Sequence, residues 1–240
     1  MERGREPILN MPRVVSALLA VLILVHVVRQ VLTENLDLWT ILTFAFIPAR
    51  YGPGGIEALP GGTGAALWSP LTYAFLHGGI THLAVNGLWL TAFGSALAWR
   101  FGAVRFLVFS AVCAVAGALT HLATHGFALQ PVVGASAAIS GHMAAVCRFA
   151  FEGGGPLSFG SRSPDRFRAP ARPLRQALAQ GRVLAFLGVW FGLNLLFGAG
   201  VSLGDDGEEI AWQAHIGGFL AGLFLFPLFD PIRSFETPAR

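Results

Sequence analysis

One serine and one histidine of this sequence lie in apolar stretches beside small residues, a pattern that suits nucleophilic catalysis. Ser136 follows Gly134 and Ala135, and His215 precedes a pair of glycines. A neutral imidazole can take the proton of a serine hydroxyl and turn its oxygen into a nucleophile. The flanking small residues would let two helices approach until the two side chains meet. The pair therefore predicts a peptidase that works below a membrane surface.

Two further polar residues could stabilise the charge that such a reaction develops. If Ser136 attacks a peptide carbonyl, with His215 as general base and then general acid, the tetrahedral oxyanion needs hydrogen-bond donors. His82 and Asn86 are four residues apart and so share one side of a helix. We predict an oxyanion hole made by Asn86, His82 and the backbone N–H of Ser136. One such donor is typically worth about 3 kcal/mol.

Acidic side chains that could orient the histidine are scarce. No Asp or Glu occurs between Ala58 and Phe151, and Glu208 and Glu209 precede the apolar stretch that carries His215. The sequence therefore predicts a Ser–His dyad rather than a triad.

The composition indicates an all-α, polytopic membrane protein. Of the 240 residues, 54% are hydrophobic and only 12% charged, and the mean hydropathy is +0.62. A soluble globule of this size would need more polar surface. Six apolar segments have the length of a bilayer span, about 20 residues. They are residues 12–31, 80–99, 104–124, 132–151, 182–201 and 210–229.

The remaining segments divide into tails, one outer loop and one linker. In the sequence, a membrane domain at 12–229 is flanked by two short tails, residues 1–11 and 230–240. The loop 32–79 contains aromatic, apolar stretches too short to span, which favours helices that lie in the membrane interface. The linker 152–181 is rich in Gly, Pro, Ser and Arg, which is typical of a flexible connection.

The distribution of arginine predicts the orientation. All 16 basic residues are arginines, and only Arg29 and Arg50 fall on the side of the 32–79 loop. The positive-inside rule then puts both termini in the cytoplasm. Nucleic-acid binding is disfavoured, because the arginines are spread over four segments without interleaved aromatic residues. The absence of lysine beside abundant Arg, Ala and Gly favours a bacterial inner membrane.

This orientation brings the candidate site residues to one depth. The second, fourth and sixth spans all run inward from the outer side. His82 and Asn86, Ser136 and His215 come early in these three spans, roughly 3 to 9 Å below the helix starts at about 1.5 Å per residue. We expect them to converge near the outer face.

At these residues the chain resembles the rhomboid intramembrane serine proteases, over nearly the whole stretch from Leu67 to Phe229. The matching pieces are LHGGITHLAVN at 76–86, GASA at 134–137 for the GxSG serine motif, and AHIGGFLAG at 214–222 for the AHxGGxxxG helix. The resemblance implies a six-transmembrane-helix rhomboid-like bundle that hydrolyses the transmembrane helices of other membrane proteins without a cofactor. It also implies that Ser136 is the nucleophile, His215 the base, and His82 and Asn86 oxyanion-hole partners.

Four small residues are expected to pack near the site: Gly134, Ala137, Gly218 and Gly222. Ala137 departs from the motif by adding a methyl group beside the nucleophile. Ser140 stands where relatives often carry an aromatic ring that packs on the histidine. Water, a backbone carbonyl or another aromatic residue could orient His215 instead.

Other polar residues of the spans are interpreted as structural. His121 and His125 are spaced i, i+4, but no third ligand accompanies them, so no metal site is predicted. His142 and Asn194 are interpreted as helix contacts. Two alternative functions remain. One is a catalytically silent rhomboid-like protein that binds membrane helices, which the presence of both Ser136 and His215 disfavours. The other is a small transporter, for which charged residues in the spans or paired repeats would be expected.

Overall fold

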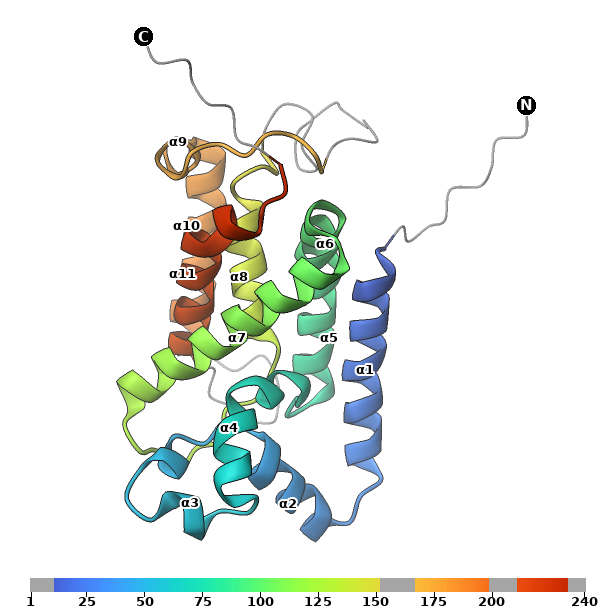
Figure 1. Ribbon diagram of the computed structural model, residues 1–240, viewed down its shortest axis with the longest axis vertical. Helices are drawn as coiled ribbons and strands as arrows, with labels where there is room; N and C mark the ends of the chain where they lie inside the picture. The colour runs from blue at the N-terminus through green and yellow to red at the C-terminus, as the bar shows by residue number, and fades with distance from the viewer. Residues whose placement is uncertain (1–10, 152–166, 199–210, 233–240) are drawn as a thin grey trace, which may run out of the picture.

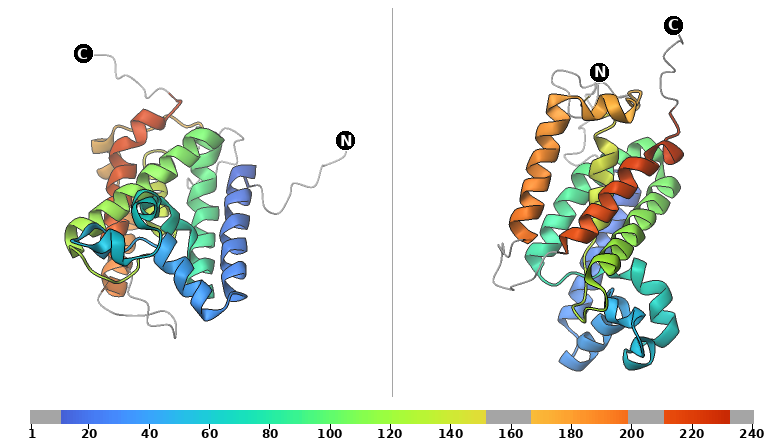
Figure 2. Two further views of the ribbon diagram at one scale, coloured as in Figure 1. Left: turned by 60° about the horizontal axis from the view of Figure 1, so that its bottom comes forward. Right: turned by 90° about the vertical axis from the view of Figure 1, so that its left-hand side faces the viewer.

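The computed structural model describes residues 11–151, 167–198 and 211–232, which form a bundle of helices (Figure 1). Three of the described helices are long and apolar enough to cross a membrane: α1 (Arg13–Gln30), α7 (Ala103–His125) and α11 (Trp212–Phe229). A further apolar helix, α10 (Gly181–Gly198), stands at the edge of the bundle beside α11 (Figure 2). The described residues contain no strand beyond one isolated bridge. The predicted all-α membrane bundle is confirmed.

The helix that carries His82 and Asn86 is longer than the predicted segment 80–99. It consists of α5 (Ile80–Trp89), a π-helical turn η3 (Leu90–Gly94) and α6 (Ser95–Phe101), which follow one another without a break. It ends at Gly102, whose φ of 76° lies in the region that favours glycine. The next helix, α7, begins directly after this turn.

The helix that carries Ser136, α8 (Ser136–Val146), is shorter than the predicted segment 132–151. The residues before it are extended rather than helical, because Val132 pairs with Phe46 through two backbone hydrogen bonds of 2.8 and 3.1 Å. Gly134 then turns the chain with a φ of 116°. Every residue from Ala137 to Val146 is buried, so α8 is the central helix of the bundle. Ser136 is therefore its first residue.

The loop 32–79, which was predicted to lie on the outer side, folds into helices at one end of the bundle (Figure 1). They are α2 (Glu34–Phe44), η1 (Pro48–Tyr51), α3 (Gly55–Ala58), α4 (Gly62–Thr72) and η2 (Tyr73–Phe75). α2 and α4 contain parts of the aromatic, apolar stretches of this loop, which were expected to lie in the membrane interface. Trp39 on α2 and Leu67 on α4 are half or more exposed, which suits such a location.

The two arginines on this side of the chain hold the loop together. The buried guanidinium of Arg50 donates to the carbonyl oxygens of Leu42 and Pro60. Arg29, near the end of α1, donates to both carboxylate oxygens of Asp37 at 2.6 and 3.0 Å. Its third hydrogen bond, 2.8 Å, reaches the carbonyl oxygen of His77 just before α5. α1, α2 and α5 are thereby fixed relative to one another.

A buried ion pair closes the opposite end. The Arg100 guanidinium, at the end of α6, donates to both carboxylate oxygens of Asp230 at 2.9 and 2.8 Å. It also donates to the carbonyl oxygens of Phe167 and Ala169, and it lies 4.4 Å from the centroid of the Phe149 ring. Both charged side chains are almost fully buried. The ends of α6 and α11 and the segment before α9 (Leu174–Leu178) are joined here.

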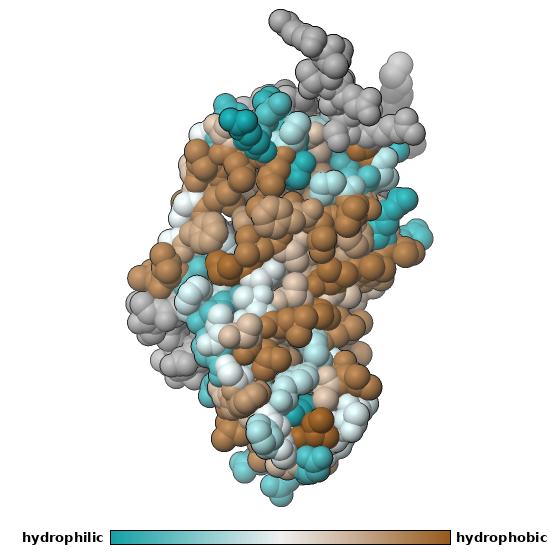
Figure 3. All heavy atoms as spheres, turned by 60° about the vertical axis from the view of Figure 1, so that its left-hand side comes forward, coloured by the Kyte–Doolittle hydropathy of each residue, from teal (hydrophilic) through white to brown (hydrophobic). Residues whose placement is uncertain are grey.

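The surface has the polarity expected of a membrane protein. Hydrophobic residues cover much of the flank of the bundle, and hydrophilic residues gather mainly toward its two ends (Figure 3).

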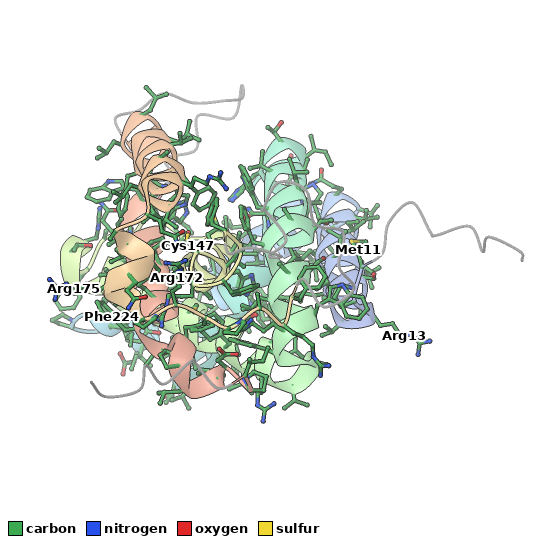
Figure 4. The ribbon with its side chains drawn as sticks, turned by 90° about the horizontal axis from the view of Figure 1, so that it is seen from above. Met11, Arg13, Cys147, Arg172, Arg175 and Phe224 are labelled. Carbon is green, nitrogen blue, oxygen red and sulfur yellow. The ribbon has the colours of Figure 1, made fainter. Side chains whose placement is uncertain are left out.

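Seen from the end that carries α9, Arg172 lies near Cys147 at the end of α8, and Arg13 lies at the far edge on α1 (Figure 4). The backbone N–H of Arg172 donates to the carbonyl oxygen of Arg148 there, at 2.9 Å.

Several predicted segments fall partly outside the described residues. These are both tails, the first part of the 152–181 linker, the last residues of the predicted span 182–201 and the first residue of the predicted span 210–229. Glu208 and Glu209 lie entirely outside them.

Candidate active site

Ser136 and His215 lie in hydrogen-bonding contact, although 79 residues separate them in the chain. His215 Nε2 is 2.7 Å from Ser136 Oγ. Ser136 is the first residue of α8 and His215 is the fourth residue of α11. Both are partly buried. An imidazole nitrogen at this distance from a serine oxygen has the geometry of a general base beside its nucleophile.

Glycines bring α8 and α11 close enough for this contact. A Cβ on Gly218 would overlap the carbonyl oxygen of Ala137, and one on Gly222 would overlap the backbone of Gly141. The two helices therefore touch through their backbones, as small residues permit in membrane proteins. Gly218 and Gly222 are two of the four small residues that were predicted to pack near the site.

The third helix around the pair is α7. A Cβ on Gly117 would lie 2.6 Å from the Cβ of Ala137 and 2.7 Å from the carbonyl oxygen of Ala214. Ala137 follows Ser136, whereas Ala214 precedes His215. Gly117 thus leaves the space that the methyl group of Ala137 occupies, which answers the question raised by this departure from the serine motif. The sequence did not indicate this role, because the two residues lie on different helices.

His82 lies beside the segment that leads into α8. A Cβ on Gly134 would be 2.6 Å from His82 Nε2 and 3.6 Å from Ser136 Oγ. The positive φ and this close approach together require glycine at position 134. The side-chain Nδ2 of buried Asn86 donates to the carbonyl oxygen of His82 at 3.1 Å. His82 thus lies beside the residues that precede Ser136, and Asn86 contacts the backbone of His82 from one turn further along α5.

The start of α8 adds donors of its own. The first amide N–H groups of a helix have no partner within the helix and lie at the positive end of its dipole. Ser136 is the first residue of α8, so its N–H belongs to this set. A negative charge that develops beside Ser136 would be stabilised there.

Asn194 contacts the histidine from the other side. Its Oδ1 lies 2.6 Å from His215 Nδ1, and its Nδ2 donates to the carbonyl oxygen of Trp190 at 2.8 Å. The sequence had indicated only a helix contact for Asn194. One available sign was its position four residues after Trp190, which puts both on one face of the helix. The hydroxyl of Ser140 donates to the carbonyl oxygen of Ser136 at 2.8 Å.

Three other histidines, His121, His125 and His142, have contacts of their own. His142 Nε2 is 2.8 Å from the hydroxyl oxygen of Ser110 on α7. The rings of His121 and His125 stack with centroids 4.1 Å apart. Among the described residues, no group of three or more His, Cys, Asp or Glu side chains could hold a metal ion.

Comparison with known proteins identifies the family. The family model of the Rhomboid domain matches residues 64–230, which is more than half of the chain. The chain belongs to the rhomboid family. This confirms the resemblance inferred from the motifs, and with it a helical bundle embedded in a membrane.

One curated rhomboid relative is the Rhomboid protease GluP of Bacillus subtilis (strain 168). The two sequences are 29% identical over 157 residues, which cover 65% of this chain and 25% of the relative. The chain thus spans about a quarter of the length of the curated rhomboid protein it matches.

Proposed function

We propose that this rhomboid-family protein is an intramembrane serine endopeptidase. The observation that carries the proposal is the 2.7 Å contact between His215 Nε2 and Ser136 Oγ. A serine in a membrane helix usually returns its hydrogen bond to a carbonyl oxygen of its own helix. Ser136 instead meets an imidazole from another helix, beside unused helix N–H groups, which is the constellation that acyl transfer needs.

The reaction follows from this contact. Ser136 Oγ attacks the carbonyl carbon of the scissile peptide bond while His215 Nε2 takes its proton. The proton then passes to the nitrogen of the leaving amine, the C–N bond breaks, and an acyl-enzyme ester remains on Ser136. Water, deprotonated by His215, attacks this ester. The bond between the acyl carbon and Ser136 Oγ then breaks, His215 returns the proton to Oγ, and the new carboxyl end is released.

The oxyanion of each tetrahedral intermediate would lie at the start of α8. We assign its stabilisation to the backbone N–H of Ser136 together with the side chains of His82 and Asn86. In the unliganded protein the Asn86 amide donates to the carbonyl oxygen of His82. It would exchange this bond for one to the oxyanion, since catalytic hydrogen bonds often form only in the complex.

The substrates we propose are transmembrane helices of other membrane proteins. Six spans, both termini in the cytoplasm of a bacterium and a site near the outer face are parts of the same proposal. They are supported by the arginine distribution and by the position of Ser136 shortly after Val132, which pairs with Phe46 of the 32–79 loop. Because a helical peptide bond is shielded by its own turn, glycine or other weak helix formers near the cut should favour cleavage.

A cleavage assay tests the proposal. Purified protein in detergent is incubated with a model transmembrane substrate, and Ser136→Ala and His215→Ala are compared with the wild type. Both should lose cleavage. Ser95→Ala and His125→Ala, which alter the same residue types away from the site, should retain it. Equal cleavage by all variants would refute the dyad, and substrate binding without cleavage by the wild type would identify a silent binder instead.

A further inference from the structure

The buried face of α10 carries one amide side chain, that of Asn194. The four buried side chains described in this helix are those of Val183, Leu187, Trp190 and Asn194, at spacings of four, three and four residues. Three of them are apolar or aromatic, and Asn194 is the polar exception. Most other side chains of α10 are exposed, as expected for a helix at the edge of the bundle (Figure 2). A polar group on the buried face of a membrane helix calls for a partner and a function.

The hydrogen bonds of Asn194 determine which way its amide points. The carbonyl oxygen of Trp190 can only accept, so the group 2.8 Å from it must be the Nδ2 donor. The reversed amide would bring two oxygens together. Oδ1 therefore faces His215 Nδ1 at 2.6 Å.

This orientation also determines the tautomer of the histidine. An amide oxygen accepts hydrogen bonds and donates none, so Nδ1 of His215 must carry the ring hydrogen. Nε2 is then left with its lone pair, and the hydroxyl of Ser136 donates to it at 2.7 Å. The opposite tautomer would place a hydrogen between Nε2 and Ser136 and leave no base.

We propose that Asn194 is the positioning residue of this site, which makes the constellation a Ser136–His215–Asn194 triad. The inference rests on the proposed function, because it assigns His215 the role of general base. Asn194 holds the ring with Nε2 toward the nucleophile, as a carboxylate does in other serine proteases. A neutral amide does this without placing a negative charge inside the membrane. Ser140 does not share the task, because its hydroxyl donates to its own helix.

Kinetics separate positioning from simple packing. Asn194→Leu keeps the number and branching of the side-chain heavy atoms and removes the acceptor, whereas Asn194→Asp keeps an acceptor toward Nδ1. We expect kcat to fall about 100-fold in the leucine variant, with KM within about twofold, since general-base catalysis typically contributes this much. The aspartate variant should recover at least about tenfold of that loss. Leu195→Ala, on the exposed face of α10, is the matched control and should keep the wild-type kcat.

The tautomer can be observed without any change at Asn194. Histidine nitrogens labelled with ¹⁵N give different chemical shifts for the protonated and unprotonated positions, and the His215→Ala spectrum assigns the signal. The wild type should carry its hydrogen on Nδ1, and Asn194→Leu should shift the population toward Nε2–H.

The outcomes distinguish this inference from the function on which it rests. A wild type that carries the hydrogen on Nε2, or an Asn194→Leu variant with wild-type kcat, would overturn the role of Asn194 and leave the dyad standing. If Ser136→Ala cleaves as well as the wild type, the proposed function fails, and the wild-type spectrum still decides the hydrogen bond to Asn194.

Discussion

Gly117 offers a way to disturb the candidate site without changing any of its polar residues. It lies on α7, where its neighbours are Ala137 and Ala214. These two residues are adjacent in sequence to Ser136 and His215. A side chain at position 117 would push against both helices that carry the pair, so the variant Gly117→Ala tests whether α7 sets their separation.

The size of the displacement follows from the contacts. The new Cβ would lie 2.6 Å from Ala137 Cβ and 2.7 Å from the carbonyl oxygen of Ala214, whereas ordinary contact begins at 3.4 Å. Each neighbour must therefore retreat by up to about 0.8 Å if α7 stays in place. Overpacking of this kind typically costs about 1–3 kcal/mol in free energy of unfolding. A misplacement approaching 1 Å at a reacting centre can lower the rate by about 100-fold.

Cleavage kinetics and thermal unfolding in detergent measure the two effects separately. We expect Gly117→Ala to lose far more kcat than its modest loss of stability would explain. Adding Ala137→Gly relieves one of the two contacts and should restore part of the rate. Gly188→Ala on α10, where a Cβ has no neighbour within 4 Å, is the control. Wild-type kcat in Gly117→Ala at an unchanged unfolding temperature would show that α7 does not set the separation of Ser136 and His215.

Two other predictions concern stability. Arg100→Met leaves the buried carboxylate of Asp230 without its ion-pair partner, so the free energy of unfolding should fall by about 3–5 kcal/mol. Adding Asp230→Asn should recover part of this loss. An unchanged midpoint of thermal denaturation in Arg100→Met would contradict the prediction. Burial, followed by the nearby His82, lowers the pKa of His77, in the loop before α5, to about 3. The unfolded chain then binds the proton more tightly, so His77 should lower the free energy of unfolding as the pH drops below about 6.5, by about 2 kcal/mol at pH 5. Between pH 7 and pH 5, His77→Gln should therefore lose about 2 kcal/mol less than the wild type, and an equal loss in both proteins would contradict this.

The sequence predicted the parts of the site that follow from topology. In the predicted topology Ser136 and His215 come early in two spans that run in the same direction, which predicts similar depths. The structure places the two side chains at hydrogen-bonding distance. The glycines beside them indicated close helix contact, and Gly218 and Gly222 make it. Helix direction and residue size were sufficient for this much.

The parts that the sequence did not predict depend on which helix faces which. Asn194 lies on a span that runs in the opposite direction to the one carrying His215, and no spacing within the chain links the two. Gly117 likewise has a function only in relation to Ala137 on another helix. The short α8 was also missed, because hydropathy does not distinguish a helix from the buried, extended residues that precede Ser136.

The reactivity of Ser136 tests most directly whether His215 makes it a nucleophile. The purified protein is treated with a serine-directed fluorophosphonate, and the modified residue is located by peptide mass spectrometry. We expect a covalent adduct on Ser136 in the wild type and its loss in His215→Ala. An adduct on another residue, or undiminished labelling of Ser136 in His215→Ala, would contradict it.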